Sequence, residues 1–181
     1  MNFVEPIRSK ETLNGILKYL KSTNERDYLL FLVGCHSALR ISDILKLKVS
    51  DAYDQKIYVS EKKTGKYRLI KLNTKVKKAL LEYAQGKDPD DYLFKSREKY
   101  NRPISRQRAW QIIKKACALF GIEKVGTHTL RKTFGYFFYL QYKDIDTLRK
   151  ILNHNTSSYT ARYIGIEQEK IDDMTSDFCL F

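Results

Sequence analysis

The sequence has little proline, glycine or cysteine and no long hydrophobic run. Its 181 residues include three proline and eight glycine residues, while 43% are hydrophobic and 13% aromatic. This composition excludes a collagen-like, low-complexity or disordered chain and supplies enough apolar material for one core. The densest apolar run, Tyr28 to Cys35, is too short to cross a bilayer, and the charged stretch from Met1 to Lys10 is not typical of a signal peptide. We therefore expect one soluble, cytoplasmic domain.

Cysteine is too rare and too irregularly spaced for a structural or metal-binding role. The three cysteines are Cys35, Cys117 and Cys179, and none belongs to a CxxC pair. An odd number at unrelated spacings argues against both a disulfide framework and a zinc finger. The sequence therefore predicts no metal site.

Acidic residues are fewer than basic ones. The chain has 21 Asp and Glu residues and 34 Lys and Arg residues, which gives a formal net charge of +13. Nine basic residues fall in 56–78 and eight in 95–115, with one glutamate in each stretch. One such stretch is usually a solvated face, but two of them on a domain of this charge favour binding of nucleic acid through its phosphates. The segment 165–181 has the opposite character, with five acidic residues and one lysine.

Hydrophobic periodicity predicts a mostly helical α+β domain with a small antiparallel sheet. Apolar residues recur at helical spacing after Ser9, from Asn73 to Gly86, and from Ser105 to Gly121, with polar N-caps at their starts. The β-branched and aromatic segments Lys56–Ser60 and Tyr67–Leu72 flank a turn at Gly65 and predict a β-hairpin. Shorter helices are expected at 128–141, 145–153 and 156–163.

Several polar residues stand where a helix needs none. Arg40 and Asp43 are three residues apart, as are His128 and Arg131, and His154 precedes Tyr163 by nine residues. A spacing of three places each pair on one helical face. Guanidinium and imidazole groups neutralise charge that builds on phosphoryl oxygens, and a tyrosine oxygen forms a covalent ester. This set fits cleavage of a phosphodiester without a metal.

Each residue alone has a simpler interpretation. Arg40 is compatible with a helix cap or a surface ion pair, and His128 with an ordinary residue at a helix N-terminus. His36 matches no chemical role, and the aromatic run 134–139 is expected in the core. The functional prediction therefore depends on all of these residues together and on their order in the chain.

That ordered set resembles the catalytic domain of the tyrosine recombinases, the phage integrase family. The matched pieces are Ala38–Leu47, the hairpin Lys63–Arg68, His128–Arg131, and Leu152 through Tyr163. The resemblance implies that Tyr163 is the nucleophile, that His128 assists proton transfer, and that Asp43 braces Arg40. It further implies that the scissile phosphate is bound by Arg40, Arg131 and His154.

A lysine of the hairpin acts as general acid on the leaving oxygen in this family. Lys63 matches that lysine best, with Lys66 and Lys62 as alternatives. The chain departs from the commonest pattern at Asn153, where glycine is usual, and at Asp43, where glutamate is commoner. Neither departure removes a reacting group.

The resemblance also implies partners. These are double-stranded DNA, other copies of the chain in a tetrameric synapse on DNA, and further recombination proteins, with no membrane and no cofactor. The expected location is therefore the nucleoid. Further DNA contacts are expected from Lys62, Lys66, Arg68, Arg106 and Arg108. A DNA-binding regulator or accessory factor that keeps the fold but does not cut DNA is the alternative function.

The expected organisation is a single catalytic domain, 1–181, with an N-terminal extension, 1–8, and a C-terminal tail, 164–181. Arg40 lies 39 residues from Met1, whereas members of the family usually carry a separate helical domain before this point. The chain is thus expected to be a catalytic fragment or a naturally short protein. The acidic tail ends in Phe178 to Phe181, and we expect it to dock on its own domain or on another copy.

Overall fold

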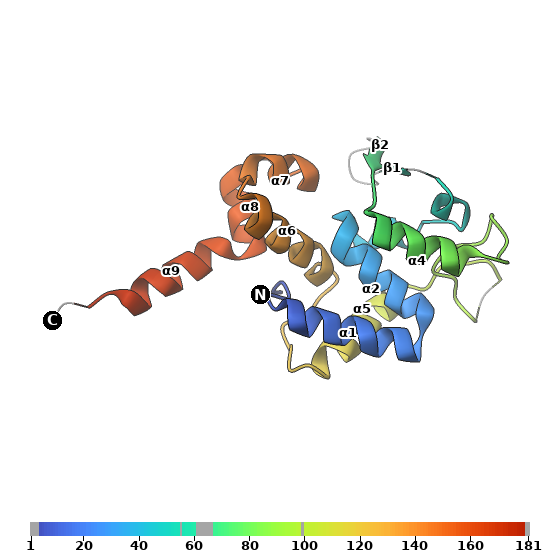
Figure 1. The fold of residues 1–181 in the computed structure, drawn as a ribbon, viewed down its shortest axis with the longest axis horizontal. Coiled ribbons are helices and arrows are strands. Elements are labelled where there is room, and N and C mark those ends of the chain that lie inside the picture. The colour runs from blue at the N-terminus through green and yellow to red at the C-terminus, as the bar shows by residue number, and fades with distance from the viewer. Residues whose placement is uncertain (1–3, 55, 61–66, 99, 180–181) are drawn as a thin grey trace.

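The structure is a computed structural model that describes residues 4–54, 56–60, 67–98 and 100–179 (Figure 1). It is mostly helical and carries one small antiparallel sheet, as the sequence predicts. In chain order its elements are α1 (Lys10–Thr23), α2 (Glu25–Ser37), α3 (Ile41–Ile44), the 3₁₀ turn η1 (Ser50–Ala52), β1 (Ile57–Ser60), β2 (Tyr67–Ile70), α4 (Thr74–Ala84), α5 (Arg106–Ala118), α6 (Thr129–Tyr142), α7 (Ile145–Leu152), α8 (Ser157–Ile164) and α9 (Ile166–Asp177).

The polar residues expected to cap helices do so. The side chain of Ser9 accepts a hydrogen bond from the amide of Thr12 at the start of α1. Asn73 and Ser105 cap α4 and α5 in the same way. Because a capping oxygen satisfies an amide that has no partner within the helix, these short polar residues fix where the helices begin.

The hairpin is confirmed where the structure describes it. Strands β1 and β2 are antiparallel, with Ile57 opposite Ile70 and Ser60 opposite Tyr67. The predicted turn at Gly65 lies outside the described residues, as do Lys62, Lys63 and Lys66.

The core has two parts, and the polar residues singled out above lie where these parts meet. The larger cluster joins buried residues of α1, α2, α4 and α5 with the start of α6. The smaller cluster consists of Ala38, Leu148, Leu152 and Ile164, covered by aromatic residues of α6. Helix α6 packs on α2 and also on α7 and α8. It therefore connects the body to the small helical unit that carries Tyr163.

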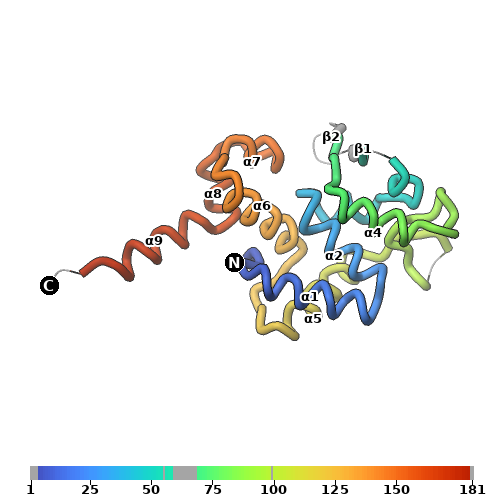
Figure 2. Tube along the Cα trace, viewed as in Figure 1, coloured from blue at the N-terminus to red at the C-terminus, as the bar shows by residue number. Residues whose placement is uncertain are grey.

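Helix α9 extends away from the body (Figures 1 and 2). None of its residues is buried, and Ile171, Met174 and Phe178 are 52%, 64% and 69% exposed. The helix runs from Ile166 to Asp177 and so covers most of the acidic tail. Over residues 170–179 the tail does not fold back on its own domain, which was one of the expected outcomes.

Within the described ranges, no helix combines the length and the apolar character that crossing a membrane requires.

Candidate active site

The structure brings five of the six predicted catalytic residues to one pocket of about 440 Å³. They come from segments far apart in the sequence, and the sixth, Lys63, lies outside the described residues. The pocket is lined by Arg40, His128, Arg131, Asn153, His154, Asn155, Thr156, Tyr159 and Tyr163.

Arg40 is placed by a sharp turn after α2. Helix α2 ends at Ser37, and Ala38 then adopts a left-handed conformation with φ of 56°. Arg40 is the N-cap of α3 rather than a residue within a helix, which corrects the expectation that it shares a helical face with Asp43. Asp43 is buried on α3, and its amide donates to the carbonyl of Arg40. Bracing of the Arg40 guanidinium by the Asp43 carboxylate stays a prediction.

Arg131 ties together the two chain segments that lead into the site. Its side chain is only 3% exposed, and its guanidinium donates to the backbone carbonyls of Ala38 and Leu152. Ala38 lies two residues before Arg40, and Leu152 lies two residues before His154. Through these two hydrogen bonds, Arg131 in the first turn of α6 holds the backbone that leads to Arg40 and the backbone that leads to His154.

Asn153 makes the turn that presents His154. It is the C-cap of α7 and adopts a left-handed conformation with φ of 51°. Glycine takes this conformation freely, and asparagine is among the few other residues that adopt it routinely. Asparagine at this position, where glycine is usual, therefore keeps the turn.

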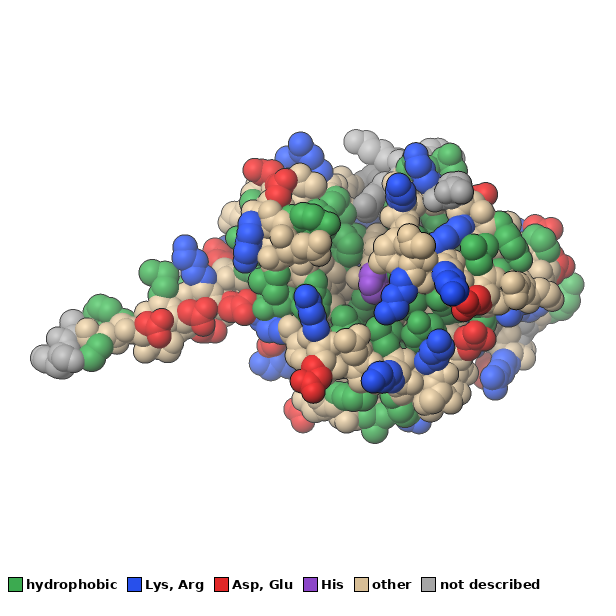
Figure 3. Space-filling view, in the orientation of Figure 1, with side chains coloured by type: hydrophobic (Ala, Val, Ile, Leu, Met, Phe, Trp, Pro, Cys, Tyr) green, Lys and Arg blue, Asp and Glu red, His purple; other side chains and the backbone are tan. Residues whose placement is uncertain are grey.

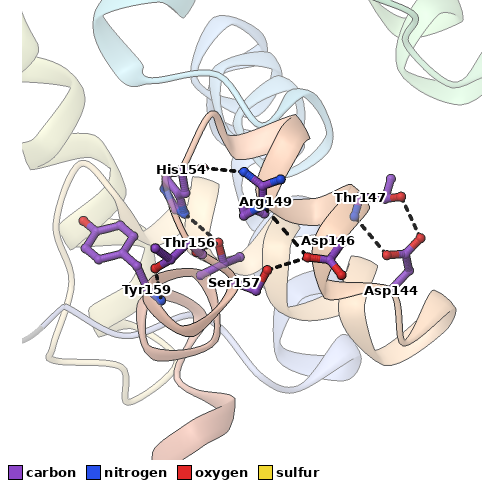
Figure 4. A network of polar contacts seen from close by, with 9 residues as sticks. Asp144, Asp146, Thr147, Arg149, His154, Thr156, Ser157 and Tyr159 are labelled. Carbon is purple, nitrogen blue, oxygen red and sulfur yellow. Dashed lines mark hydrogen bonds and ion pairs between the residues drawn. The ribbon is translucent and has the colours of Figure 1, made fainter.

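The loop around His154 is held by a network of polar contacts (Figure 4). The backbone of His154 donates to the carbonyl of Arg149 over 3.0 Å, and Nη1 of Arg149 donates to the carbonyl of His154 over 3.3 Å. Nδ1 of His154 lies 3.2 Å from Oγ1 of Thr160, which itself donates to the carbonyl of Thr156. Because the hydroxyl proton of Thr160 is thus engaged, Nδ1 of His154 is the donor. Nε2 of the neutral ring then carries the lone pair.

The electrostatics of the pocket keep both histidines neutral. Burial, with the charges of Arg131 and Arg40, lowers the pKa of His154 to about 4. The same causes in the same order lower the pKa of His128 below its ordinary value. Two fixed cations in a partly buried site oppose the charging of an imidazole.

Tyr163 lies on α8 against both histidines. Its hydroxyl is 3.2 Å from Nδ1 of His128, and its ring meets the ring of His154 edge-on at 4.8 Å. Burial raises the pKa of Tyr163 to about 12, and the positive charge of Arg131 opposes this shift. The phenol is therefore protonated at neutral pH and lies beside a neutral imidazole that can accept its proton.

The sequence analysis missed two side chains that lie against the ring of Tyr163. Tyr159 is 54% exposed; its ring lies 6.3 Å from that of Tyr163 at an angle of 25°, and 4.8 Å from the ring of His154. The ammonium of Lys132 lies 5.1 Å from the centre of the Tyr163 ring. The available signals were a spacing of four residues between Tyr159 and Tyr163, and the position of Lys132 directly after Arg131.

The expected DNA contacts fall into three groups. Arg106 and Arg108 are exposed on the first turn of α5, and the charge of Arg106 contributes to the lowered pKa of His128. The backbone of Arg68 pairs with that of Val59 in the hairpin. Lys62 and Lys66 lie outside the described residues. Basic side chains spread over the visible face of the body with acidic ones among them, and a row of acidic side chains follows α9 (Figure 3).

Within the described part of the chain, no group of three or more His, Cys, Asp and Glu side chains is arranged to hold a metal ion.

Known proteins resemble this chain in sequence and in fold. Residues 8–170 match the model of the phage integrase family. The chain is 47% identical over 170 residues to the "Probable integrase/recombinase YoeC" of Bacillus subtilis, covering 93% of each chain. Its fold is similar to that of the XerA recombinase, with a TM-score of 0.76 and 24% identity over 96% of this chain. It is also similar to the XerH site-specific recombinase bound to its difH substrate, with a TM-score of 0.72 and 19% identity over 97% of this chain. The chain spans 63% and 54% of these two crystallised chains.

Proposed function

This chain belongs to the phage integrase family, and on that premise we propose that it breaks and rejoins DNA strands as a tyrosine-type site-specific recombinase. One observation carries the proposal. The phenol of Tyr163 lies within hydrogen-bond distance of His128 in a pocket that also contains Arg40 and Arg131. A nucleophile, a base and two fixed cations are the parts that metal-free phosphoryl transfer to a tyrosine requires.

The proposed reaction begins with a DNA phosphate held by Arg40 and Arg131. The Tyr163 oxygen attacks phosphorus while its proton passes to Nδ1 of His128. The bond from phosphorus to the 5′ oxygen breaks, which leaves a 3′-phosphotyrosyl ester and a 5′ oxygen that takes up a proton. A 5′ hydroxyl then attacks the ester and releases Tyr163. The ester conserves the bond energy, so rejoining consumes no nucleotide.

His154 is proposed to contact a phosphoryl oxygen. Its Nδ1 is engaged with Thr160, so the ring reaches the phosphate through Nε2. In the free protein Nε2 carries a lone pair and does not donate. A bound phosphate is anionic and favours a proton on Nε2, which turns His154 into a cationic donor at the transition state.

The decisive experiment uses a duplex with a nick close to the cut site, so that the short product diffuses away and the covalent complex accumulates. Wild type is expected to form an adduct that denaturing electrophoresis detects, and Tyr163→Phe is expected to form none. Tyr159→Phe is the matched control, because it removes a phenol that lines the same pocket. An adduct with Tyr163→Phe contradicts the assignment. DNA binding without an adduct by wild type favours the regulator instead.

Lys63 is proposed as the general acid for the leaving 5′ oxygen. A substrate with sulfur in place of that oxygen needs no proton, so it is expected to restore cleavage by Lys63→Ala. Restoration in Lys66→Ala in its place contradicts the choice of lysine.

We propose further that copies of the chain assemble on double-stranded DNA through the C-terminal tail. Helix α9 combines acidic residues with the exposed Ile171 and Met174 and is followed by the exposed Phe178, whereas the rest of the chain is basic. Such a helix suits a complementary surface on another copy. Deleting Asp172 to Phe181 is expected to reduce the mass of the complex on DNA in analytical ultracentrifugation. A truncated protein that cleaves and assembles like the full chain contradicts this proposal.

A further inference from the structure

The segment Val4–Ser9, here called the N-terminal strap, contacts α6, α9 and the loop before α6. Its first half is fixed to the loop that precedes His128. The amide of Glu5 donates to the carbonyl of Lys124 over 3.0 Å, and the two side chains form an ion pair at 3.1 Å. Ile7 is fully buried, and its amide donates to the hydroxyl of Thr133 on α6.

The other end of the strap is fixed to α9. Nη1 of Arg8 lies 2.9 Å from Oε2 of Glu169, and the hydroxyl of Tyr136 donates to Oε1 of the same carboxylate over 3.0 Å. The Arg8 guanidinium also lies 5.2 Å from the centre of the Tyr136 ring. Both oxygens of Glu169 are thus engaged, one by the strap and one by α6. Figure 2 shows the segment that precedes α1 near the end of α9 that joins α8.

Arg8 lies directly against the joint between α8 and α9. That joint is Gly165, which has φ of 81° and follows Tyr163 by two residues. A Cβ atom at Gly165 would lie 2.8 Å from Nη2 of Arg8. The guanidinium therefore occupies the space beside the backbone that ends α8, and it limits how far the joint can move.

Lys132 on α6 links the strap to the ring of Tyr163. Nζ of Lys132 donates to the carbonyl of Val4 over 2.7 Å and lies 5.1 Å from the centre of the Tyr163 ring. The strap is thereby linked to the loop before His128, to the nucleophile ring and to the end of the nucleophile helix. These are the parts whose relative placement sets the distance between Tyr163 and His128.

We propose that Arg8 and Glu169 are positioning residues that hold α8 so that Tyr163 stays within reach of His128 and the phosphate. This inference rests on the proposed function. Helix α8 has eight residues, of which Thr160 and Ile164 are buried, and it packs on α6, α7 and α9. The Arg8–Glu169 pair fixes the start of α9, and with it the end of α8 that follows Tyr163. A shift of about 1 Å at a reacting group, caused by a distant mutation, can cost on the order of 100-fold in rate.

The test reverses each charge and then both. Arg8→Glu and Glu169→Arg are each expected to lower the single-turnover rate of adduct formation on the nicked duplex by about tenfold or more. The double variant restores the pair with its polarity exchanged and is expected to recover most of that rate. Each melting temperature is expected to shift by less than about 4 °C, because an ion pair of this exposure contributes little to stability. Duplex affinity is measured in parallel, so that a loss of binding is not mistaken for a loss of rate.

A remote ion pair supplies the matched control. Lys48 and Asp90 lie 3.3 Å apart on the body. Lys48→Glu and Asp90→Lys change the net charge as the test variants do, and they are expected to cleave at the wild-type rate. Single variants of Arg8 and Glu169 that cleave like wild type overturn the inference, and so does a double variant that recovers nothing.

A second measurement does not depend on cleavage. 3-Fluorotyrosine at position 163 gives a ¹⁹F resonance that reports the surroundings of the ring. The resonance is expected to move in both single variants and to return towards its wild-type position in the double variant. If wild type forms no adduct, the proposed function fails, while this resonance still decides the positioning role. A resonance unmoved in the single variants overturns that role.

Discussion

The phenol oxygen of Tyr163 lies 3.2 Å from Nδ1 of His128, although the two residues are 35 positions apart in the chain. Burial raises the pKa of Tyr163 to about 12, and burial also lowers the pKa of His128. A protonated phenol therefore faces a neutral imidazole, and the hydrogen bond between them runs along the path of the proton in the proposed attack.

Removing the imidazole of His128 is expected to slow cleavage and to leave DNA binding nearly unchanged. Loss of a general base typically costs about 100-fold to 10,000-fold in rate. His128→Gln is compared with wild type in single-turnover cleavage and in duplex binding. His36→Gln is the control, since His36 bonds to the carbonyl of Leu32 and lies outside the pocket lining. Equal rates for wild type and His128→Gln contradict the role of base.

Arg40→Ala and Arg131→Ala are expected to lose cleavage alike but to differ in stability. Each removes a cation from the pocket, at a cost on the order of 100-fold in rate, as for a lost oxyanion donor. Arg131→Ala also leaves the carbonyls of Ala38 and Leu152 without their donor, which costs about 1–3 kcal/mol for each group that stays buried.

Thermal unfolding and duplex binding separate these effects. Arg131→Ala is expected to melt at a lower temperature than Arg40→Ala, and both variants are expected to bind DNA with modest loss because many other basic groups contact phosphates. Parallel losses of binding and cleavage instead make the two arginines general phosphate contacts.

DNA binding is expected to take up a proton at His154. The pKa of His154 is about 4 in the free protein, and an adjacent phosphate raises it. Between these two pKa values the complex holds more protons than the free protein, so affinity rises as the pH falls. The Kd of Tyr163→Phe for a duplex is measured from about pH 5 to about pH 8 at constant ionic strength, a range that spans the ordinary titration of histidine.

When His154→Gln is added to Tyr163→Phe, the Kd for the duplex is expected to become nearly independent of pH. When His128→Gln is added instead, the Kd is expected to keep its dependence on pH. An unchanged slope without His154 assigns the proton to another group.

The left-handed turn at Asn153 predicts a dependence on backbone conformation. Asn153→Gly is expected to behave like wild type, while Asn153→Val strains the backbone by about 1–2 kcal/mol and lowers the melting temperature by about 2–8 °C. Cleavage is expected to fall as well, because His154 follows directly. Lys143→Val is the control: Lys143 has φ of 54° at the end of α6, away from the pocket lining. It is expected to lose stability but to keep its cleavage rate.

Tyr159 is expected to act through its ring rather than its hydroxyl. The ring stands edge-on to the imidazole of His154 at 4.8 Å, and such a contact contributes about 0.5–1.5 kcal/mol. Tyr159→Phe keeps the ring and is expected to cleave like wild type. Tyr159→Ala frees the imidazole and is expected to cleave up to about tenfold more slowly, which corresponds to that energy. Equal rates for Tyr159→Ala and Tyr159→Phe contradict this role.

Much of the fold was predictable because its signals are local. The capping oxygens of Ser9, Asn73 and Ser105 act on amides three residues away, and helical periodicity repeats within one turn. The extent of α9 was not predictable to the residue, since a helix without buried residues lacks the apolar stripe that marks the ends of the others. Arg40 lies just before α3 because Ala38 adopts a left-handed backbone conformation, and no residue pattern in the sequence marks an alanine that does so.

Residue types and spacings are local properties of the chain, so they were enough to predict which chemical groups the site has and in which order they occur. How those groups act on one another depends on the folded arrangement. Arg131 holds the segments before Arg40 and His154 through backbone carbonyls, which any sequence supplies. The protonation states of Tyr163 and His154 arise from burial and from charges brought close by folding, and Arg8 reaches Glu169 across 161 positions. Interactions of this range depend on distances that exist only after the chain has packed.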